Sequence, residues 1–122
     1  MVYYNEKPSV FEDEINGSST RYHWDIESYE QEDQEGTHTA WRCEEILVYA
    51  PFTVNKFIKA VIDAKWGNGY EEKLINEYNS AQMGLIEGEE AAAAIARYRQ
   101  FLIDRAALKE KVEADCVEHG IY

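Results

Sequence analysis

The sequence predicts an α+β fold, in which a small antiparallel sheet near the N-terminus packs on a layer of about three helices, the last of them long. Two observations support this prediction. Residues 21–49 contain two stretches rich in β-forming side chains around a polar turn, and residues 51–119 contain helical patterns separated by glycines. With 122 residues the chain has the length of a single domain, 1–122, made of a β-rich segment over 1–50 with acidic loops and a helical segment over 51–122.

The chain is expected to begin with a short strand at Met1–Tyr4, because Pro8 and the acidic side chains after it prevent a longer one. Val10 and Phe11 are apolar residues within a polar stretch, and we expect them to dock on the sheet or on a neighbouring molecule. The residues of Asn16–Ser19 are typical of a turn.

A hairpin is expected next. Residues 21–29 alternate between apolar and polar side chains, which predicts a half-buried strand. Its apolar face carries Tyr22, Trp24 and Ile26, and its polar face carries His23, Asp25 and Glu27. After a polar connection at 30–36, a second strand is expected over 37–49, with Trp41, Cys43, Leu47 and Tyr49 on one face and Ile46 and Val48 on the other. Because an isolated hairpin is marginally stable in water, helices must pack against it.

The strongest helical pattern lies at 51–66. Its apolar side chains recur at the spacing of one helix face, and they are Val54, Phe57, Ile58, Val61, Ile62 and Trp66. Thr53 stands at the N-cap position, and Gly67 stands where a left-handed residue would end the helix. Burial of each large side chain contributes roughly 1.5–3 kcal/mol before the loss of conformational entropy is subtracted. The other elements must therefore cover this face.

Two further helices are expected. The first spans about Tyr70 to Met83, and its inward side chains are Leu74, Ile75 and Tyr78. The second begins near Gly88 as N-cap and has no Gly or Pro until Gly120, so it would be ~45 Å long. Its apolar stripe is Ala94, Ile95, Tyr98, Phe101, Leu102, Leu108, Val112 and Cys116. A helix of that length exceeds the width of a small domain, so we expect its second half to protrude or to meet another chain. Heptad counting from Ile95 places Arg105 and Lys109 in the seam, which disfavours a coiled coil.

The charge is concentrated in the first third of the chain. Residues 1–36 carry ten acidic and two basic side chains, a net charge of −8, and residues 37–122 carry fourteen acidic and ten basic ones, a net charge of −4. An acidic segment repels phosphate backbones, so nucleic acid is not an expected partner. Solubility of an exposed loop and attraction to a basic partner surface both explain such acidity.

The sequence predicts a protein that resides in the cytoplasm or is assembled inside a cell. Cys43 and Cys116 do not form a disulfide framework, the segment Met1–Val10 lacks the apolar core of a secretory leader, and no apolar run approaches a membrane span. We therefore expect no secretion by a signal peptide and no membrane partner.

Candidate chemistry is sparse. The acidic turn at 30–36 lacks the final glutamate of a calcium loop, because Arg42 takes its place. Cys116 and His119 share a helix face but form only two ligands of a metal site. We expect Glu44 and Glu45 to point to opposite faces of their strand, and His23 and Asp25 to be solvated. No nucleotide-binding or nucleophile motif occurs, so no cofactor, metal or small-molecule substrate is expected.

The aromatic residues offer two kinds of surface. Trp24, Trp41 and Trp66 each fall in phase with a face that we expect to be buried, which favours a core role over a binding platform. The candidate partner-binding residues are instead Tyr3, Tyr4, Val10 and Phe11, since the sequence around them is too polar to enclose them.

Several packing motifs carry a resemblance to a known group. They are Pro51, Thr53, Phe57-Ile58, Ala60-Val61-Ile62 and Ala64-Lys65-Trp66, then Glu72, Leu74-Ile75-Asn76, Tyr78-Asn79 and Met83-Gly84-Leu85, then Tyr98, Phe101, Lys109, Val112 and Asp115, with Tyr3-Tyr4-Asn5 and Tyr22–Ile26 before them. This pattern resembles a group of small uncharacterised proteins encoded by gut bacteria of the Bacteroides type and by their phages or prophages. The resemblance implies a β-rich segment followed by helices, and a virion, tail or assembly role. It brings no catalytic residues.

Three functional hypotheses follow. The first is a non-enzymatic, phage- or prophage-related structural or assembly protein that acts through protein–protein contacts or self-association. The second is an acidic inhibitor or decoy that occupies a basic site on a partner, which requires the carboxylates of residues 1–36 to form one continuous face. The third is a small enzyme using His23, Asp25 or His38, which requires two of these side chains to share a pocket.

Overall fold

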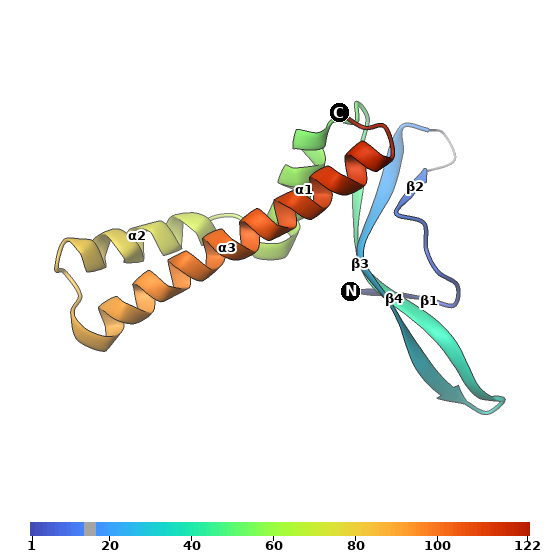
Figure 1. The fold of residues 1–122 in the computed structure, drawn as a ribbon, viewed down its shortest axis with the longest axis horizontal. Coiled ribbons are helices and arrows are strands. Elements are labelled where there is room, and N and C mark those ends of the chain that lie inside the picture. Colours follow the sequence, from blue (N-terminus) through green and yellow to red (C-terminus); the bar gives the residue numbers. More distant parts are fainter. Residues whose placement is uncertain (14–16) are drawn as a thin grey trace. The chain divides into compact units, whose positions relative to one another are not determined.

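The computed structural model describes residues 1–13 and 17–122 and confirms the α+β fold (Figure 1). Within these residues the strands come first, and they are β1 (Val2–Tyr4), β2 (Phe11–Asp13), β3 (Ser19–Asp33) and β4 (Gly36–Tyr49). The helices that follow are α1 (Val54–Trp66), α2 (Tyr70–Gln82) and α3 (Gly88–Glu118). The chain divides into two compact units, Met1–Phe57 and Ile58–Tyr122. Asn16, the first residue of the predicted turn, lies outside the described residues.

The sheet is antiparallel throughout, with the strand order β1-β4-β3-β2. The two central strands form a long hairpin that runs from the pair Ser19 and Tyr49 to the pair Asp33 and Gly36. The outer strands are short: β1 pairs with residues 41–43 of β4, and β2 pairs with residues 20–22 of β3. The hairpin beyond them, residues 29–40, is therefore a two-stranded ribbon, which we call the arm (Figure 1).

A break in strand register distinguishes β3 from the predicted strand. Pairing with β4 shifts between Trp24 and Glu27, and Asp25 takes a left-handed conformation with φ 53°. Before this bulge, Tyr22, His23 and Trp24 are buried in succession, because the strand is covered on both of its faces there. The prediction that His23 lies on a solvated face is therefore wrong.

Aromatic rings build the core of the first unit. The ring of Tyr22 stacks on Phe11 at 4.9 Å and on Trp24 at 5.4 Å, and it meets Phe57 of α1 edge to face at 6.0 Å. The start of α1 is therefore part of this unit. Near the end of β4, Val48 is buried whereas Leu47 and Tyr49 are exposed.

Helix α1 has the predicted boundaries and buried face. The hydroxyl of Thr53 accepts a hydrogen bond from the backbone N–H of Lys56 at 3.3 Å, which confirms the N-cap, and Gly67 has φ 74°. Phe57, Ile58 and Val61 are buried. Because Phe57 belongs to the first unit and Ile58 to the second, the boundary between the units lies within this helix.

In the second unit, α2 packs along α3. The buried side chains of α3 are Ala94, Phe101, Leu108, Val112 and Cys116, and Leu74 is the buried one of α2. The expected stripe also contained Ile95 and Leu102, but these are exposed, so the seven-residue repeat begins at Ala94 instead of Ile95. Helix α3 begins at Gly88 with Glu87 as its N-cap residue, one position before the predicted cap.

A charged residue also lies in this stripe. Arg105 stands between the buried Phe101 and Leu108, and its Nη1 donates a hydrogen bond to Oε1 of Glu71 on α2 at 2.6 Å. The ion pair keeps the guanidinium partly exposed at the edge of the contact, where burial costs little. None of the described helices is long and apolar enough to cross a membrane.

Candidate functional site

Three ionisable side chains meet inside the sheet of the first unit: Tyr4 of β1, His23 of β3 and Glu45 of β4, which we call the Tyr4–His23–Glu45 cluster. They meet because β4 lies between β1 and β3, and because His23 is directly opposite Glu45 in the strand register. Nε2 of His23 lies 2.8 Å from Oε1 of Glu45 and 3.2 Å from the Tyr4 hydroxyl. The Tyr4 hydroxyl also donates a hydrogen bond to Oε1 of Glu45.

The segment that leads into β2 closes the other side of the imidazole. Nδ1 of His23 lies 2.6 Å from the carbonyl oxygen of Ser9, and the backbone N–H of His23 donates to the carbonyl of Val10 at 2.8 Å. A carbonyl and a carboxylate both accept hydrogen bonds, so both ring nitrogens face acceptors. The imidazole is therefore held in place from two sides.

The cluster changes the acidity of its members. Burial works against the charge of Glu45, but hydrogen bonds from Tyr4 and His23 and the positive charge of His23 outweigh it and lower the pKa of this carboxyl. The hydrogen bond to Glu45, with burial and the repulsion of that carboxylate, raises the pKa of Tyr4 to about 12. Both shifts stabilise the same state, in which the tyrosine is neutral and the glutamate is charged.

This cluster connects neighbouring strands. His23 is fully buried, and its two ring nitrogens contact the carbonyl of Ser9 and the carboxylate of Glu45. In the part of the chain that the structure describes, no group of three or more His, Cys, Asp or Glu side chains is arranged to hold a metal ion.

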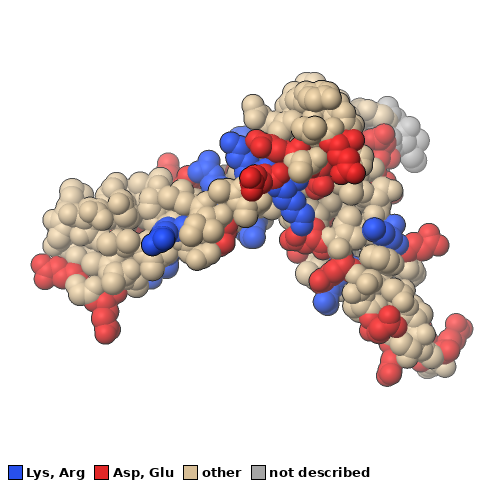
Figure 2. Space-filling model, in the orientation of Figure 1, with Lys and Arg blue, Asp and Glu red and all other residues tan. Residues whose placement is uncertain are grey.

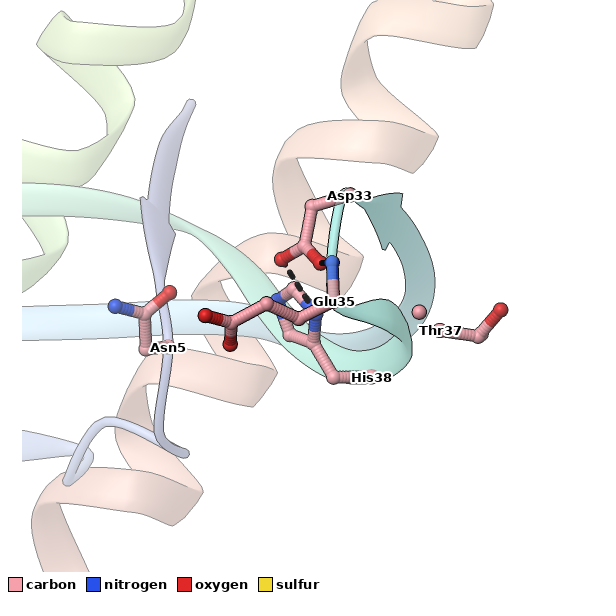
Figure 3. Close-up of a pocket in the computed structure, with 6 residues that line it drawn as sticks. Asn5, Asp33, Glu35, Thr37 and His38 are labelled. Atoms are coloured by element: carbon pink, nitrogen blue, oxygen red, sulfur yellow. Dashed lines mark hydrogen bonds and ion pairs between the residues drawn. The ribbon is translucent and has the colours of Figure 1, made fainter.

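A second polar site lies at the tip of the arm. A hollow there is lined by Asn5, Asp33, Glu35, Gly36, Thr37 and His38 (Figure 3). Asp33 closes the turn, because one of its oxygens accepts the backbone N–H of Glu35 at 2.8 Å and the other lies 3.2 Å from Nδ1 of His38. In Figure 3 the side chain of Glu35 extends toward Asn5, which follows β1. The hollow therefore lies where β1 ends and the arm continues.

The candidate catalytic residues do not share a pocket. His23 pairs across the sheet with Glu45, whereas His38 pairs with Gln31 near the tip of the arm. His38 and Glu45 are seven positions apart along β4, which corresponds to roughly 20 Å of strand. Asp25 is exposed at the bulge.

The predicted partner-binding residues also lie in different environments. Tyr3 is 63% exposed, and its ring meets Tyr29 edge to face at 6.1 Å. Tyr4 belongs to the cluster, Val10 is half-buried with its carbonyl bonded to His23, and Phe11 stacks in the aromatic core. These four residues therefore do not form one surface.

The second unit holds the other candidate pair. Cys116 is buried, and burial with the neighbouring Asp115 charge raises the pKa of its thiol to about 11. Nδ1 of His119 lies 2.8 Å from the carbonyl oxygen of Asp115. A thiol held protonated is a poor metal ligand.

Sequence reasoning missed the Tyr4–His23–Glu45 cluster because its members are far apart in the chain and no local pattern connects them. No protein-family model, curated protein or solved structure matches this chain. The resemblance to small phage and prophage proteins of Bacteroides-type bacteria therefore stays a prediction.

Proposed function

We propose that this chain is a non-enzymatic structural or assembly protein, phage- or prophage-related, that acts through contacts with other proteins. The observation that carries this proposal is the arm. From Asp25 to Thr39 no described side chain is buried, and Ala40, the last residue of the arm, lies with the other buried apolar residues of the first unit at the base of the hairpin and beyond it. The arm is thus regular structure without a core of its own.

Such a segment is costly to keep ordered. Fixing the backbone of one residue costs roughly 1–2 kcal/mol of conformational entropy, and a two-stranded ribbon alone is marginally stable in water. The arm buries little that would offset this cost. The role of the arm is therefore best explained by the surface that it presents to another molecule.

The ionisable groups of the sheet support the same conclusion. His23 and Glu45, which have the residue types of an acid–base pair, bond to each other, to Tyr4 and to the Ser9 carbonyl. They connect β1, β3, β4 and the segment before β2, which is a structural role. The phage or prophage context rests on the resemblance in sequence, and with it the expected place of the protein in the cytoplasm or in a virion.

The arrangement of the acidic residues does not favour a decoy with one continuous acidic face. In the strand register Glu30 and Glu32 lie on one face of the ribbon, whereas Glu27 and Asp33 lie on the opposite one. Figure 2 shows acidic side chains standing out along the arm, and the residues that supply them belong to both faces. The arm therefore fits insertion or edge contact better than a flat charged interface.

An arm-shortened variant tests the proposal. Residues 30–39 are replaced by an Asn-Gly turn that joins Tyr29 to Ala40, a directly opposed pair, so that the sheet at the base is retained. The gene is deleted from the strain that encodes the protein, and the strain is complemented with the full chain or with the arm-shortened variant. Assembled particles are then counted after prophage induction. A matched control keeps the arm and changes only Tyr49, which is exposed outside it, to serine.

We expect the full chain and the control to restore assembly and to sediment with particles or assembly intermediates, and the arm-shortened form to fail while keeping its thermal midpoint. Unchanged particle yield in the gene deletion, together with a monomer by light scattering that sediments alone in the induced lysate, would overturn the proposal.

A further inference from the structure

The β4 edge of the arm has backbone groups that no strand covers. In an antiparallel ladder the N–H and C=O groups of alternate residues point away from a given neighbour. Trp41 and Cys43 direct theirs toward β1, where they face Tyr4 and Val2. Thr39 and Thr37 occupy the next equivalent positions, and within the described residues no strand lies beside them.

The edge is open because the chain turns away from it after β1. Extending the register of β1 would place Glu6 opposite Thr39 and Pro8 opposite Thr37. Proline has no N–H to give to a strand, and Pro8 is buried elsewhere in the unit. Beyond Asn5, the hollow at the tip of the arm is bordered by Asp33, Glu35 and His38 (Figure 3).

The two edges of the arm differ in how well they are protected. On the β3 side the bulge at Asp25 comes just before the arm, and charged Glu30 and Glu32 follow along the edge. Bulges and edge charges are the usual means of preventing a further strand from joining a sheet. The β4 side carries Thr37, His38, Thr39 and Ala40, without a lysine, a proline or a bulge. This side is therefore the receptive one.

The charge of the arm indicates the chemistry of the partner. Residues 29–40 contain four acidic side chains and no lysine or arginine. Glu32 and Glu30 lie opposite Thr37 and Thr39 and on the same face, and Thr39 donates a hydrogen bond to Glu30 at 3.1 Å. A strand beside β4 would lie roughly 10 Å from β3, two strand spacings away. Threonine is small, so lysine or arginine side chains of that strand can reach these glutamates across it.

We propose that the arm binds an extended, basic segment of a partner protein, which adds a strand to the β4 edge at Thr37 and Thr39 in line with β1. A second copy of this chain would bind the β4 edge less favourably, because two arms side by side would bring like charges together. This inference rests on the proposed function and names the surface and the kind of partner.

The test uses the full chain and defined peptide probes. A short peptide alternating lysine and threonine is titrated into the protein, followed by fluorescence anisotropy and by hydrogen exchange of the backbone amides. Two control peptides match it in length: one has glutamate in place of lysine, and one keeps the lysines but has a methylated backbone that cannot pair as a strand. We expect only the first peptide to bind, with protection of the Thr37 and Thr39 amides and weaker binding at high salt.

Variants locate the contact. Thr39→Pro removes an N–H that points away from β3, so the hairpin keeps its own ladder, and we expect binding to weaken at least about tenfold. Thr39→Val keeps that N–H and serves as the matched control, with affinity within about twofold of the original. Glu30→Gln with Glu32→Gln should weaken binding and reduce its salt dependence, with the fold checked by circular dichroism.

The outcomes separate this inference from the proposed function. Equal binding of the methylated peptide, or unchanged binding by Thr39→Pro, would overturn strand addition and leave an acidic contact surface. Protection of Thr37 and Thr39 that depends on protein concentration alone would replace the basic partner with a second copy. Absence of binding to every probe, with particle assembly still dependent on the arm, would overturn the β4-edge inference and leave the proposed function standing.

Discussion

The imidazole of His23 and the carboxylate of Glu45 meet inside the sheet, with 2.8 Å between Nε2 and Oε1, from directly opposed positions on β3 and β4. The imidazole is fully buried, whereas the carboxylate keeps a fifth of its side chain exposed. The pair therefore lies at the border between core and solvent, where the hydrogen bonds of Tyr4 and Ser9 decide its stability.

Replacing Glu45 should destabilise the sheet at neutral pH but not in acid. The pKa of Glu45 is lowered in the folded chain, so its contribution is present above the unfolded value of about 4.3 and is lost as the pH falls through the lower folded value. We expect Glu45→Gln to cost roughly 1.5–3 kcal/mol at pH 7, with the difference shrinking below pH 4. Urea unfolding at several pH values measures this. Glu44→Gln is the control, and an equal loss there would contradict a role for the cluster.

Tyr4 should make stability depend on alkaline pH in the opposite direction. Its pKa rises from about 10 when unfolded to about 12 when folded, so its contribution is complete below pH 10 and is lost as the pH rises through 12. We expect Tyr4→Phe to cost about 1 kcal/mol at pH 7 and to lose this alkaline dependence. Ultraviolet titration of the nine tyrosines should show one late-ionising group that disappears in Tyr4→Phe. A titration curve of the same shape for both proteins would refute the assignment.

Phe57 should be essential to the first unit. Its ring is fully buried and contacts Phe11 at 5.3 Å, Phe52 at 6.0 Å and Tyr22 at 6.0 Å. Phe57→Ala should therefore cost roughly 3–5 kcal/mol, because it removes apolar burial and leaves a cavity. Thermal unfolding monitored by near-ultraviolet circular dichroism reports the loss. Tyr49→Ala, at an exposed aromatic outside the arm, should stay within about 0.5 kcal/mol.

Two leucines of α3 test the phase of its buried stripe. Leu108 is 7% exposed and Leu102 is 42% exposed, although the sequence pattern assigned both to the same face. Leu108→Ala should cost roughly 2–5 kcal/mol, and Leu102→Ala less than about 1 kcal/mol. The substitution is the same in both variants, so helix propensity cancels in the comparison of their denaturant midpoints. Equal losses would mean that Leu102 is covered by another surface in solution.

The sequence predicts the parts of the fold that depend on nearby residues. Thr53 and Gly67 mark the ends of α1 because a cap and a left-handed glycine act within one turn of the helix. The hairpin follows from alternating side chains around a polar turn. Such signals are local, and they were sufficient for the α+β class.

Other features depend on contacts that no local pattern contains. The burial of His23 requires a bulge at Asp25 and a carboxylate twenty-two residues away at Glu45. The buried repeat of α3 begins at Ala94, and Arg105 beside it bonds to Glu71 of α2, a pairing that apolar periodicity cannot indicate. The sequence pattern also predicted one partner-binding surface made of Tyr3, Tyr4, Val10 and Phe11. In the sheet these side chains lie in different environments.

The absence of buried side chains between Asp25 and Thr39 has a consequence for evolution. Substitutions in a ribbon that supports no core change the outside of the molecule with little effect on whether it folds. Related chains could therefore keep the aromatic core around Tyr22 and Phe57. The sequence of the hairpin tip could meanwhile change quickly, together with the surface of the partner protein that it contacts.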